Sequence, residues 1–248
     1  MILSKPLESF KIDSLSKRWA AVLLLLFAWG VSFWFLKAPP GDSDFSQLMY
    51  WYEDLTEAED YAAFYDAHPF ENAFTVDNLL YLCALAVYFS VMFLLGLFYF
   101  VMYGCDLREV PLSKAPGIYF TRIWWLVLYS ASVCFPALLI LGFLPVAFLF
   151  FIPSFYLRSG LVFFEKKDAY SATLLSSIRS HGHRLSIVAE LTGILLIYIV
   201  LHLIVMFVLK EESVGLFLVE SFLRAYFVLV LFRNMGSRYH MATMLEKE

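Results

Sequence analysis

Long stretches with few or no charged residues are the feature that most constrains what this chain can fold into. Six of them occur, at residues 19–36, 78–102, 123–141, 144–157, 185–209 and 214–232. About 20 mostly apolar residues cross a bilayer as a helix, so each stretch predicts a membrane span. The chain is 61% hydrophobic and 16% charged, which is too apolar for a soluble domain. We expect an all-α, polytopic transmembrane helical bundle of about six helices, forming a single domain over residues 1–248.

Two of these regions allow a second interpretation. The first stretch follows Lys17 and Arg18, as a signal peptide would, but it is longer than the usual core of about 7 to 15 residues. An uncleaved anchor is therefore favoured. Residues 123–157 hold 35 positions without a charge, enough for two short helices with a turn near Gly142 and Pro145. A pair of re-entrant segments is the alternative there.

The basic residues give the predicted helices an orientation. Fifteen of the eighteen Lys and Arg residues fall in the N-terminal segment, in the loops 104–122 and 158–184, and in the C-terminal tail. Short loops rich in Lys and Arg stay on the cytoplasmic side. The sequence therefore predicts a multi-pass protein of a bacterial cytoplasmic (inner) membrane with both termini in the cytoplasm.

The same count places residues 41–77 outside, as an acidic loop between the first two helices. No Lys or Arg occurs between Lys37 and Arg108, whereas ten acidic and nine aromatic residues lie between Gly41 and Asp77. Apolar positions with helical spacing predict a short amphipathic helix on the outer surface: Leu48, Trp51, Tyr52 and Leu55. The loop is interpreted as a solvated cap with aromatic anchors, or as a contact surface for an envelope protein. It lacks the spacing of a calcium-binding loop.

Residues 165–180 predict an amphipathic helix on the inner face. Tyr170, Leu174 and Ile178 are four residues apart and form one apolar stripe between basic residues. Such a helix lies in the interface, where its cations meet anionic lipid head groups, although a protein docking site would have the same pattern. The candidate inner-surface and lipid-contact residues are Lys166, Lys167, Arg179, His181, His183 and Arg184.

The stretch 152–184 resembles a known pattern. Its elements are the run Ile152-Pro153-Ser154-Phe155-Tyr156-Leu157-Arg158, then Glu165, Ala172, Ser176, Ser177 and Ser180, and the turn His181-Gly182-His183-Arg184. These resemble the YciC-like and glycerophosphodiester phosphodiesterase membrane-region proteins. His181 replaces the family's Lys, and Lys166 replaces a second acid. The resemblance implies a six-helix membrane architecture without an attached activity, because the phosphodiesterase chemistry of the fused proteins resides in a separate soluble domain.

No catalytic, cofactor or metal site is expected. His181 and His183 could bind a metal if a carboxylate or Cys105 joined them, but two ligands do not make a zinc site, and hydrogen bonds to head groups are favoured. Hydrolase and protease motifs are absent from the sequence, and the acidic balance disfavours nucleic acid. An intramembrane lipid enzyme would require a polar cavity at head-group depth lined by Asp106, Glu165 and His183.

Four ionisable residues within the predicted spans are candidate functional residues, because a charge inside the bilayer costs at least a few kcal/mol. They are Glu190, His202, Glu220 and Arg224. Glu220 and Arg224 are four apart and can pair on one helix face. Glu190 is shallow enough to reach Arg184 or water. A packing clamp and a polar path for a proton or anion are the two interpretations.

The sequence thus favours a non-enzymatic inner-membrane component that binds an envelope or other partner. A small-solute, anion or proton-coupled transporter that uses His202, Glu220 and Arg224 is the alternative. Substrate, partner and oligomeric state are not readable from the sequence.

Overall fold

A computed structural model describes residues 9–11, 19–128, 153, 155–209 and 213–245, and all further structural statements concern these residues. Within these ranges the chain is helical and contains no strand. Residues 115–128 form a helix that continues the turn η1. The other helical elements are α2 (Trp19–Lys37), α3 (Ser46–Glu57), α4 (Tyr61–Ala67), α5 (Phe70–Ala73), α6 (Val76–Leu107), η1 (Leu112–Lys114), α9 (Arg158–Phe164), α10 (Ala169–Ser180), η3 (His181–His183), α11 (Arg184–Val208) and α12 (Val214–Leu245).

Four helical stretches are long and apolar enough to cross a membrane. They are Trp19–Lys37, Val76–Leu107, Ala169–Val208, which includes α10 and η3 before α11, and Val214–Met244. They include the stretches predicted as spans at 19–36, 78–102 and 214–232 and nearly all of 185–209, each of which is helical. The predicted spans 123–141 and 144–157 lie mostly outside the described residues. Both α6 and α12 extend well past the predicted ends, since a helix can continue into polar sequence once tertiary contacts support it.

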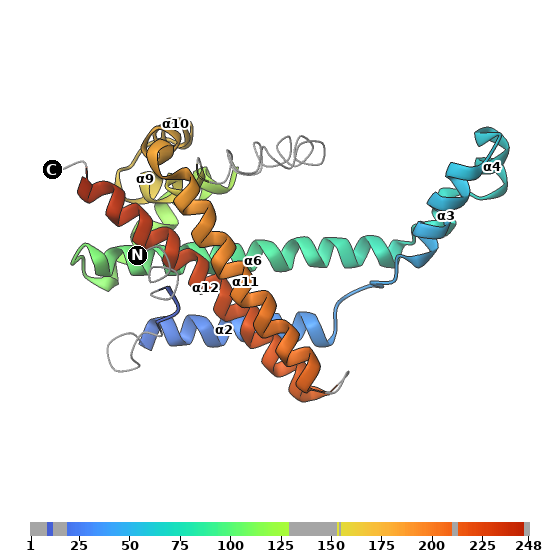
Figure 1. Cartoon of the computed structure of the whole chain (residues 1–248), viewed down its shortest axis with the longest axis horizontal. Helices are drawn as coiled ribbons and strands as arrows, with labels where there is room; N and C mark the ends of the chain where they lie inside the picture. The colour runs from blue at the N-terminus through green and yellow to red at the C-terminus, as the bar shows by residue number, and fades with distance from the viewer. Residues whose placement is uncertain (1–8, 12–18, 129–152, 154, 210–212, 246–248) are drawn as a thin grey trace.

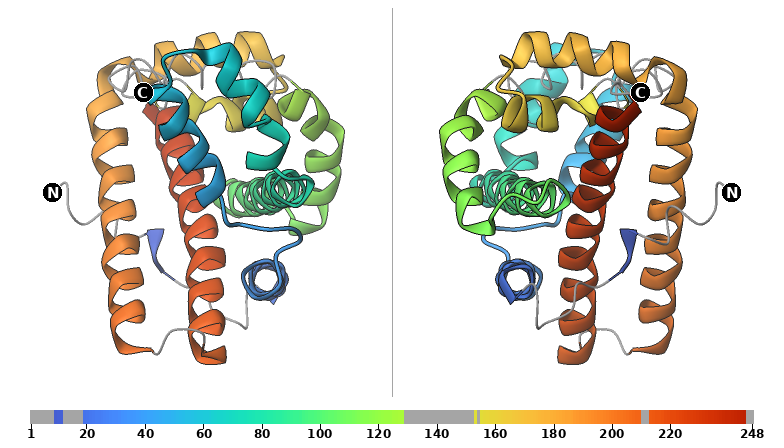
Figure 2. Two further views of the ribbon diagram at one scale, coloured as in Figure 1. Left: turned by 90° about the vertical axis from the view of Figure 1, so that its right-hand side faces the viewer. Right: turned by 90° about the vertical axis from the view of Figure 1, so that its left-hand side faces the viewer.

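The spanning helices form two pairs that cross obliquely, with α12 at the centre. Figure 1 shows α2 beside α6 and α11 beside α12, and Figure 2 shows the first pair end-on. Helix α12 packs against α6, α2 and α11. Helices α2 and α11 run in one direction, and α6 and α12 run in the other. We call the end at which α6 and α12 finish the inner end, and the opposite end the outer end.

The end of α6 and the start of α11 lie at the same end of the bundle, the inner end (Figure 1).

A close approach of α6 to α12 depends on a glycine. A Cβ atom at Gly96 would lie 2.2 Å from the ring of Phe232, so any larger residue would push the two helices apart. The buried side chains Leu97, Phe100 and Leu229 continue this contact along the helices. On the other side, Ala28 and Phe35 of α2 pack against Tyr88 and Met92 of α6.

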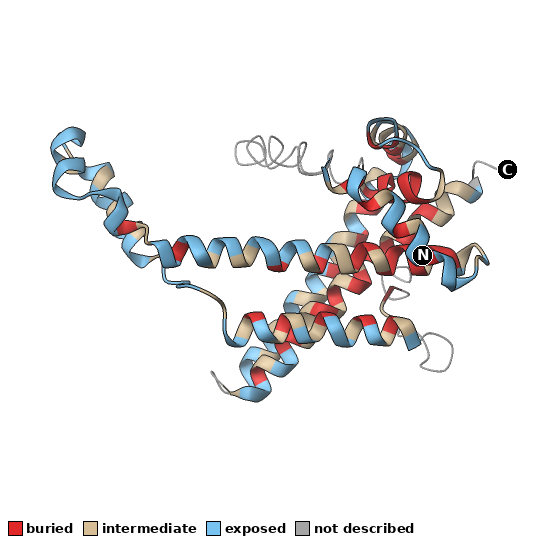
Figure 3. Cartoon of the chain, turned by 180° about the vertical axis from the view of Figure 1, so that it is seen from behind, coloured by how far each residue is buried: buried red, intermediate tan, exposed pale blue. Residues whose placement is uncertain are grey.

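The outer surface of the bundle is apolar over a long distance. On α11 the exposed large apolar residues include Leu195, Leu196, Ile199, Val200, Leu203, Ile204 and Phe207. Figure 3 shows exposed residues along the part of α6 that is nearer to its start, up to residue 93. A soluble monomer rarely exposes an apolar surface of this extent, whereas lipid covers it without cost.

Candidate functional site

A buried polar network joins α11 to α12 near the inner end. The Glu190 carboxylate pairs with Arg238, whose Nε lies 2.6 Å from Glu190 Oε2 and whose Nη2 donates to the Ser186 hydroxyl at 2.6 Å. Glu190 is 2% exposed. Burying a carboxylate in this way is tolerable only because a cation and further donors compensate it.

Asn234 extends the network to two more segments. Its Nδ2 donates to Glu190 Oε2 at 3.3 Å and to the Ser9 hydroxyl at 3.1 Å, and its carbonyl oxygen accepts from the Tyr156 hydroxyl. The network therefore joins four parts of the chain, which are the N-terminal segment, the segment that precedes α9, helix α11 and helix α12. The prediction that Glu190 reaches Arg184 or water is wrong, because Glu190 is buried and pairs with Arg238 of α12.

The second ion pair lies toward the outer end and within one helix. Arg224 Nη2 is 2.6 Å from Glu220 Oε1, which confirms the predicted pairing. The Arg224 side chain is 33% exposed. His202 stacks on Tyr198 of its own helix, and its Nδ1 is buried without a hydrogen-bond partner among the described residues. The structure thus brings Glu220 and Arg224 together, and it shows no hydrogen bond from either to His202.

The predicted inner-surface cations divide into two groups. Lys166, Lys167, His181 and His183 are exposed. By contrast, Arg179 pairs with Glu165 at 2.7 Å, and Arg184 Nη2 donates to the Ser177 hydroxyl at 2.9 Å. The two arginines therefore make contacts within residues 165–184. The two lysines and two histidines are the residues accessible to lipid or to a partner.

Helix α10 is turned with its small residues inward. Ala169, Ala172, Ser176 and Ser180 are buried, and α9 is its main neighbour. The predicted stripe of Tyr170, Leu174 and Ile178 is exposed. Asp168 caps the first turn by accepting from the Ser171 amide at 2.9 Å. Hydrogen bonds from the Ser171 hydroxyl and from its amide lower the pKa of the Asp168 carboxyl group. An apolar stripe facing outward supports the predicted interfacial position of this helix.

The residues at the inner ends of α6, α9, α10 and α12 line a cavity of about 640 Å³ that is open to the surface, which we call the inner cavity. Its lining residues are Leu107, Arg108, Glu109, Glu165, Arg179, His240, Thr243 and Met244. Glu165 is thus the one member of the predicted trio with Asp106 and His183 that lines it. Arg179 is a predicted inner-surface residue, whereas the sequence does not single out the remaining lining residues, because they come from separate elements.

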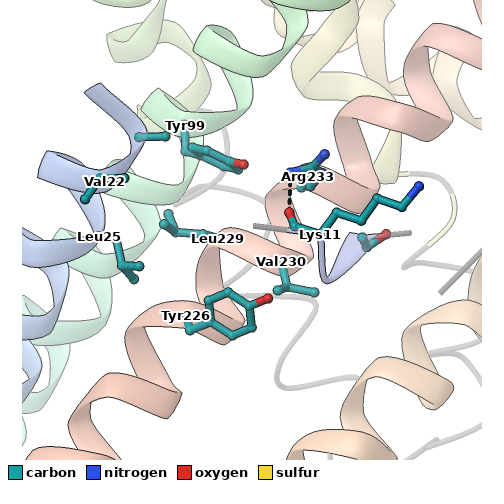
Figure 4. A pocket seen from close by; sticks show the side chains of 10 residues that line it. Lys11, Val22, Leu25, Tyr99, Tyr226, Leu229, Val230 and Arg233 are labelled. Atoms are coloured by element: carbon teal, nitrogen blue, oxygen red, sulfur yellow. Dashed lines mark hydrogen bonds between the residues drawn. The ribbon is translucent and has the colours of Figure 1, made fainter. Parts of the chain in front are cut away.

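A second cavity, lined by Ser9, Tyr226 and Arg233, has a volume of about 40 Å³ and is shown in Figure 4. Arg233 Nη1 donates to the Lys11 carbonyl at 2.7 Å, and the Tyr226 hydroxyl donates to the Phe10 carbonyl at 2.5 Å. Roughly two or three water molecules fill such a volume. These contacts fasten the N-terminal segment to α12.

The acidic loop forms a helical projection, residues 41–75, which we call the outer arm. Figure 1 shows α3 and α4 extending beyond the outer end of α6. Helix α3 confirms the predicted short helix. None of the residues of α3 or α4 is buried. Helices α3 and α4 of the outer arm are therefore not part of the bundle core, and their surfaces are left uncovered.

Two sets of contacts hold the outer arm in shape. At its base, Asn78 Nδ2 donates to the carbonyls of Asp42 and Asp44 at 3.0 and 2.9 Å. Gly41, at a φ of 80°, brings the chain so close to α6 that a Cβ there would lie 2.2 Å from the Asp77 carbonyl. At the tip, the Trp51 indole donates to the His68 carbonyl at 2.9 Å and packs against three aromatic rings, those of Phe64, Tyr65 and Phe70.

Comparison of the chain with known protein families, curated proteins and solved structures gave no match. The resemblance of residues 152–184 to the YciC-like group therefore stays a prediction. Among the residues described, no three His, Cys, Asp or Glu side chains gather as metal ligands would. The apolar helices define the class of the chain as a helical membrane protein.

Proposed function

We propose that this membrane protein is a non-enzymatic binding component whose outer arm contacts a protein with a basic surface. The observation that carries the proposal is the arm itself, which projects from the bundle without burying α3 or α4. A segment that only linked α2 to α6 would not need three helices, a glycine-dependent base and an aromatic tip.

The composition of the arm favours a basic protein over the lipid surface. It carries most of the ten acidic residues of positions 41–77 and no Lys or Arg. Anionic lipids would repel it, whereas a basic protein surface would be attracted and correctly oriented. Tyr50, Tyr52 and Tyr61 are exposed among these acids. Tyrosine is enriched at protein interfaces, where it buries a large area at a small entropic cost.

Photo-crosslinking from the arm in living cells tests this function. A photoreactive residue is placed at the exposed position Tyr52, in the native chain and in the charge variant Glu53→Gln/Asp54→Asn/Glu57→Gln. We expect a protein adduct that disappears in the charge variant and persists in the matched uncharged control Gln47→Ala on the same helix. An adduct with lipid alone, or a protein adduct of equal yield in the charge variant, would contradict the proposal.

Transport of a proton or small anion is the second candidate, and His202 is the observation that favours it. A buried ring nitrogen in a membrane helix, without a partner among the described residues, is the type of group that proton paths use. Transport requires a continuous route past His202 and Arg224. Neither of the two cavities described above is lined by these residues, so the binding role is preferred.

A further inference from the structure

We propose that the inner cavity binds a phosphate group, carried either by a membrane lipid or by a small soluble phosphoester. This site is separate from the outer arm and goes beyond the function proposed above. The cavity volume of about 640 Å³ falls within the range of small-molecule sites, which is about 300 to 1,000 Å³. Its lining combines charged, hydroxyl and apolar side chains, which come from both ends of the stretch 165–180, from the end of α6 and the residues after it, and from α12.

The charged residues of the inner cavity's lining are two arginines, Arg108 and Arg179, and two glutamates, Glu109 and Glu165. Arg179 Nη1 lies 2.7 Å from Glu165 Oε1, and the Tyr239 hydroxyl donates to the same oxygen at 3.1 Å. Arg108 Nη2 in turn donates to the Tyr239 hydroxyl at 2.7 Å. Two guanidinium groups therefore share one carboxylate in this chain of contacts. Glu109 is exposed to solvent and contributes less to the potential inside.

The Arg108 side chain is held in place before any ligand arrives. Its guanidinium carbon lies 4.7 Å from the ring centre of Phe164 and 4.9 Å from that of Tyr239. Guanidinium groups that stack on aromatic rings keep their edge N–H donors available, and their planar fork matches two phosphate oxygens. His240, near the end of α12, adds an imidazole to the lining. The Thr243 hydroxyl, also on the lining, donates to the His240 carbonyl at 2.8 Å.

The position of the cavity fits a group at the depth of lipid head groups. It lies where α6 and α12 finish, at the end that the basic residues predict to be cytoplasmic. Two apolar residues, Leu107 and the exposed Met244, belong to its lining, so an acyl chain could leave the cavity along them. Nearby, α10 exposes the apolar stripe that is expected to lie in the interface.

Binding to delipidated full-length protein in detergent tests the proposal with two matched pairs of probes. Dioleoylphosphatidate is compared with dioleoylglycerol by native mass spectrometry, and glycerol 3-phosphate is compared with glycerol by calorimetry. We expect at least one phosphate-bearing probe to bind about tenfold or more tightly than its phosphate-free counterpart, and Arg108→Gln to weaken that binding about tenfold or more. Lys114→Gln, which removes an exposed charge of the same end outside the lining, should leave it unchanged.

The pattern of results identifies the source of the phosphate. Preference for phosphatidate alone assigns a lipid, whereas tight binding of glycerol 3-phosphate assigns a soluble phosphoester. The proposal is overturned if neither pair shows a preference, or if Lys114→Gln weakens binding as much as Arg108→Gln does.

A second variant keeps the test decisive if Arg108→Gln does not fold. Thr243→Trp narrows the cavity and leaves the contacts among Arg108, Tyr239, Glu165 and Arg179 in place. It should abolish the preference for phosphate while the melting temperature stays close to that of the native chain. A folded Thr243→Trp variant that binds the phosphate probe normally would show that the inner cavity is not the site.

Discussion

The two ion pairs of the α11–α12 hairpin differ in almost every physical respect. Glu190 and Arg238 belong to different helices, and their side chains are 3% and 10% exposed. Glu220 and Arg224 lie one turn apart on α12, and the arginine is one-third exposed. The first pair is extended by Asn234 and Ser186. We infer that the inner pair fixes how the helices pack, whereas the outer pair neutralises two charges that α12 would otherwise carry through the membrane.

Removal of one partner of the inner pair should give the largest effect. Arg238→Ala leaves the Glu190 carboxylate buried without its cation, which costs about 3 to 5 kcal/mol in buried pairs. We expect a large fall in the melting temperature of the purified protein in detergent. The double variant Glu190→Gln/Arg238→Met removes both charges and should recover most of the loss. Equal losses in the single and double variants would mean that the pair itself does not fix the packing.

A smaller loss of stability is expected for a variant that removes hydrogen bonds of Asn234 but keeps the ion pair between Glu190 and Arg238. Asn234→Leu removes the hydrogen bonds to Ser9 and Glu190 and leaves the Tyr156 hydroxyl without its acceptor. A buried polar group left unsatisfied costs about 1 to 3 kcal/mol. Melting temperatures should therefore place Asn234→Leu between the native chain and Arg238→Ala. Tyr156→Phe, which removes one hydroxyl only, is the control and should lose less than Asn234→Leu.

The loss of stability should be smaller still when the outer pair, Glu220 and Arg224, is broken. Arg224→Gln breaks an i,i+4 pair whose arginine is one-third exposed and whose glutamate is largely buried; exposed pairs of this spacing contribute about 0 to 1 kcal/mol in water. We expect a minor change in melting temperature, which would sharpen the contrast with Arg238→Ala. The same variant and Glu220→Gln also test transport, by the decay of a pH gradient in proteoliposomes loaded with a pH-sensitive dye. Faster or slower decay than in the native protein, without loss of stability, would favour the transporter over the binding component.

The two pairs also show what the sequence could and could not reveal. Glu220 and Arg224 are four residues apart, so helical geometry alone placed them in contact. The partner of Glu190 is 48 positions away in the chain, and several arginines could have reached it. Spans, the α10 stripe and the helix α3 depend on local periodicity, and each of these was predictable. The inner cavity was not, because Arg108, Glu165 and His240 meet only through tertiary packing.

The smallest effect on stability is expected at an exposed carboxylate, that of Asp168. Asp168 accepts from the Ser171 hydroxyl and from the Ser171 amide at the start of α10, and these hydrogen bonds depress the pKa of its carboxyl group. A depressed pKa in the folded state means that the stabilisation is present above the ordinary value of 3.8 and is lost as the pH falls through the lower folded value.

We therefore expect the first turn of α10 to lose protection from hydrogen exchange only at pH values below about 4, after correction for the intrinsic exchange rate. Asp168→Asn keeps a neutral acceptor at the cap, so its protection should not show that step. An identical step in both chains would place the pH dependence elsewhere than at Asp168. Exchange confined to α10 thus separates a local cap from a contact that holds the bundle.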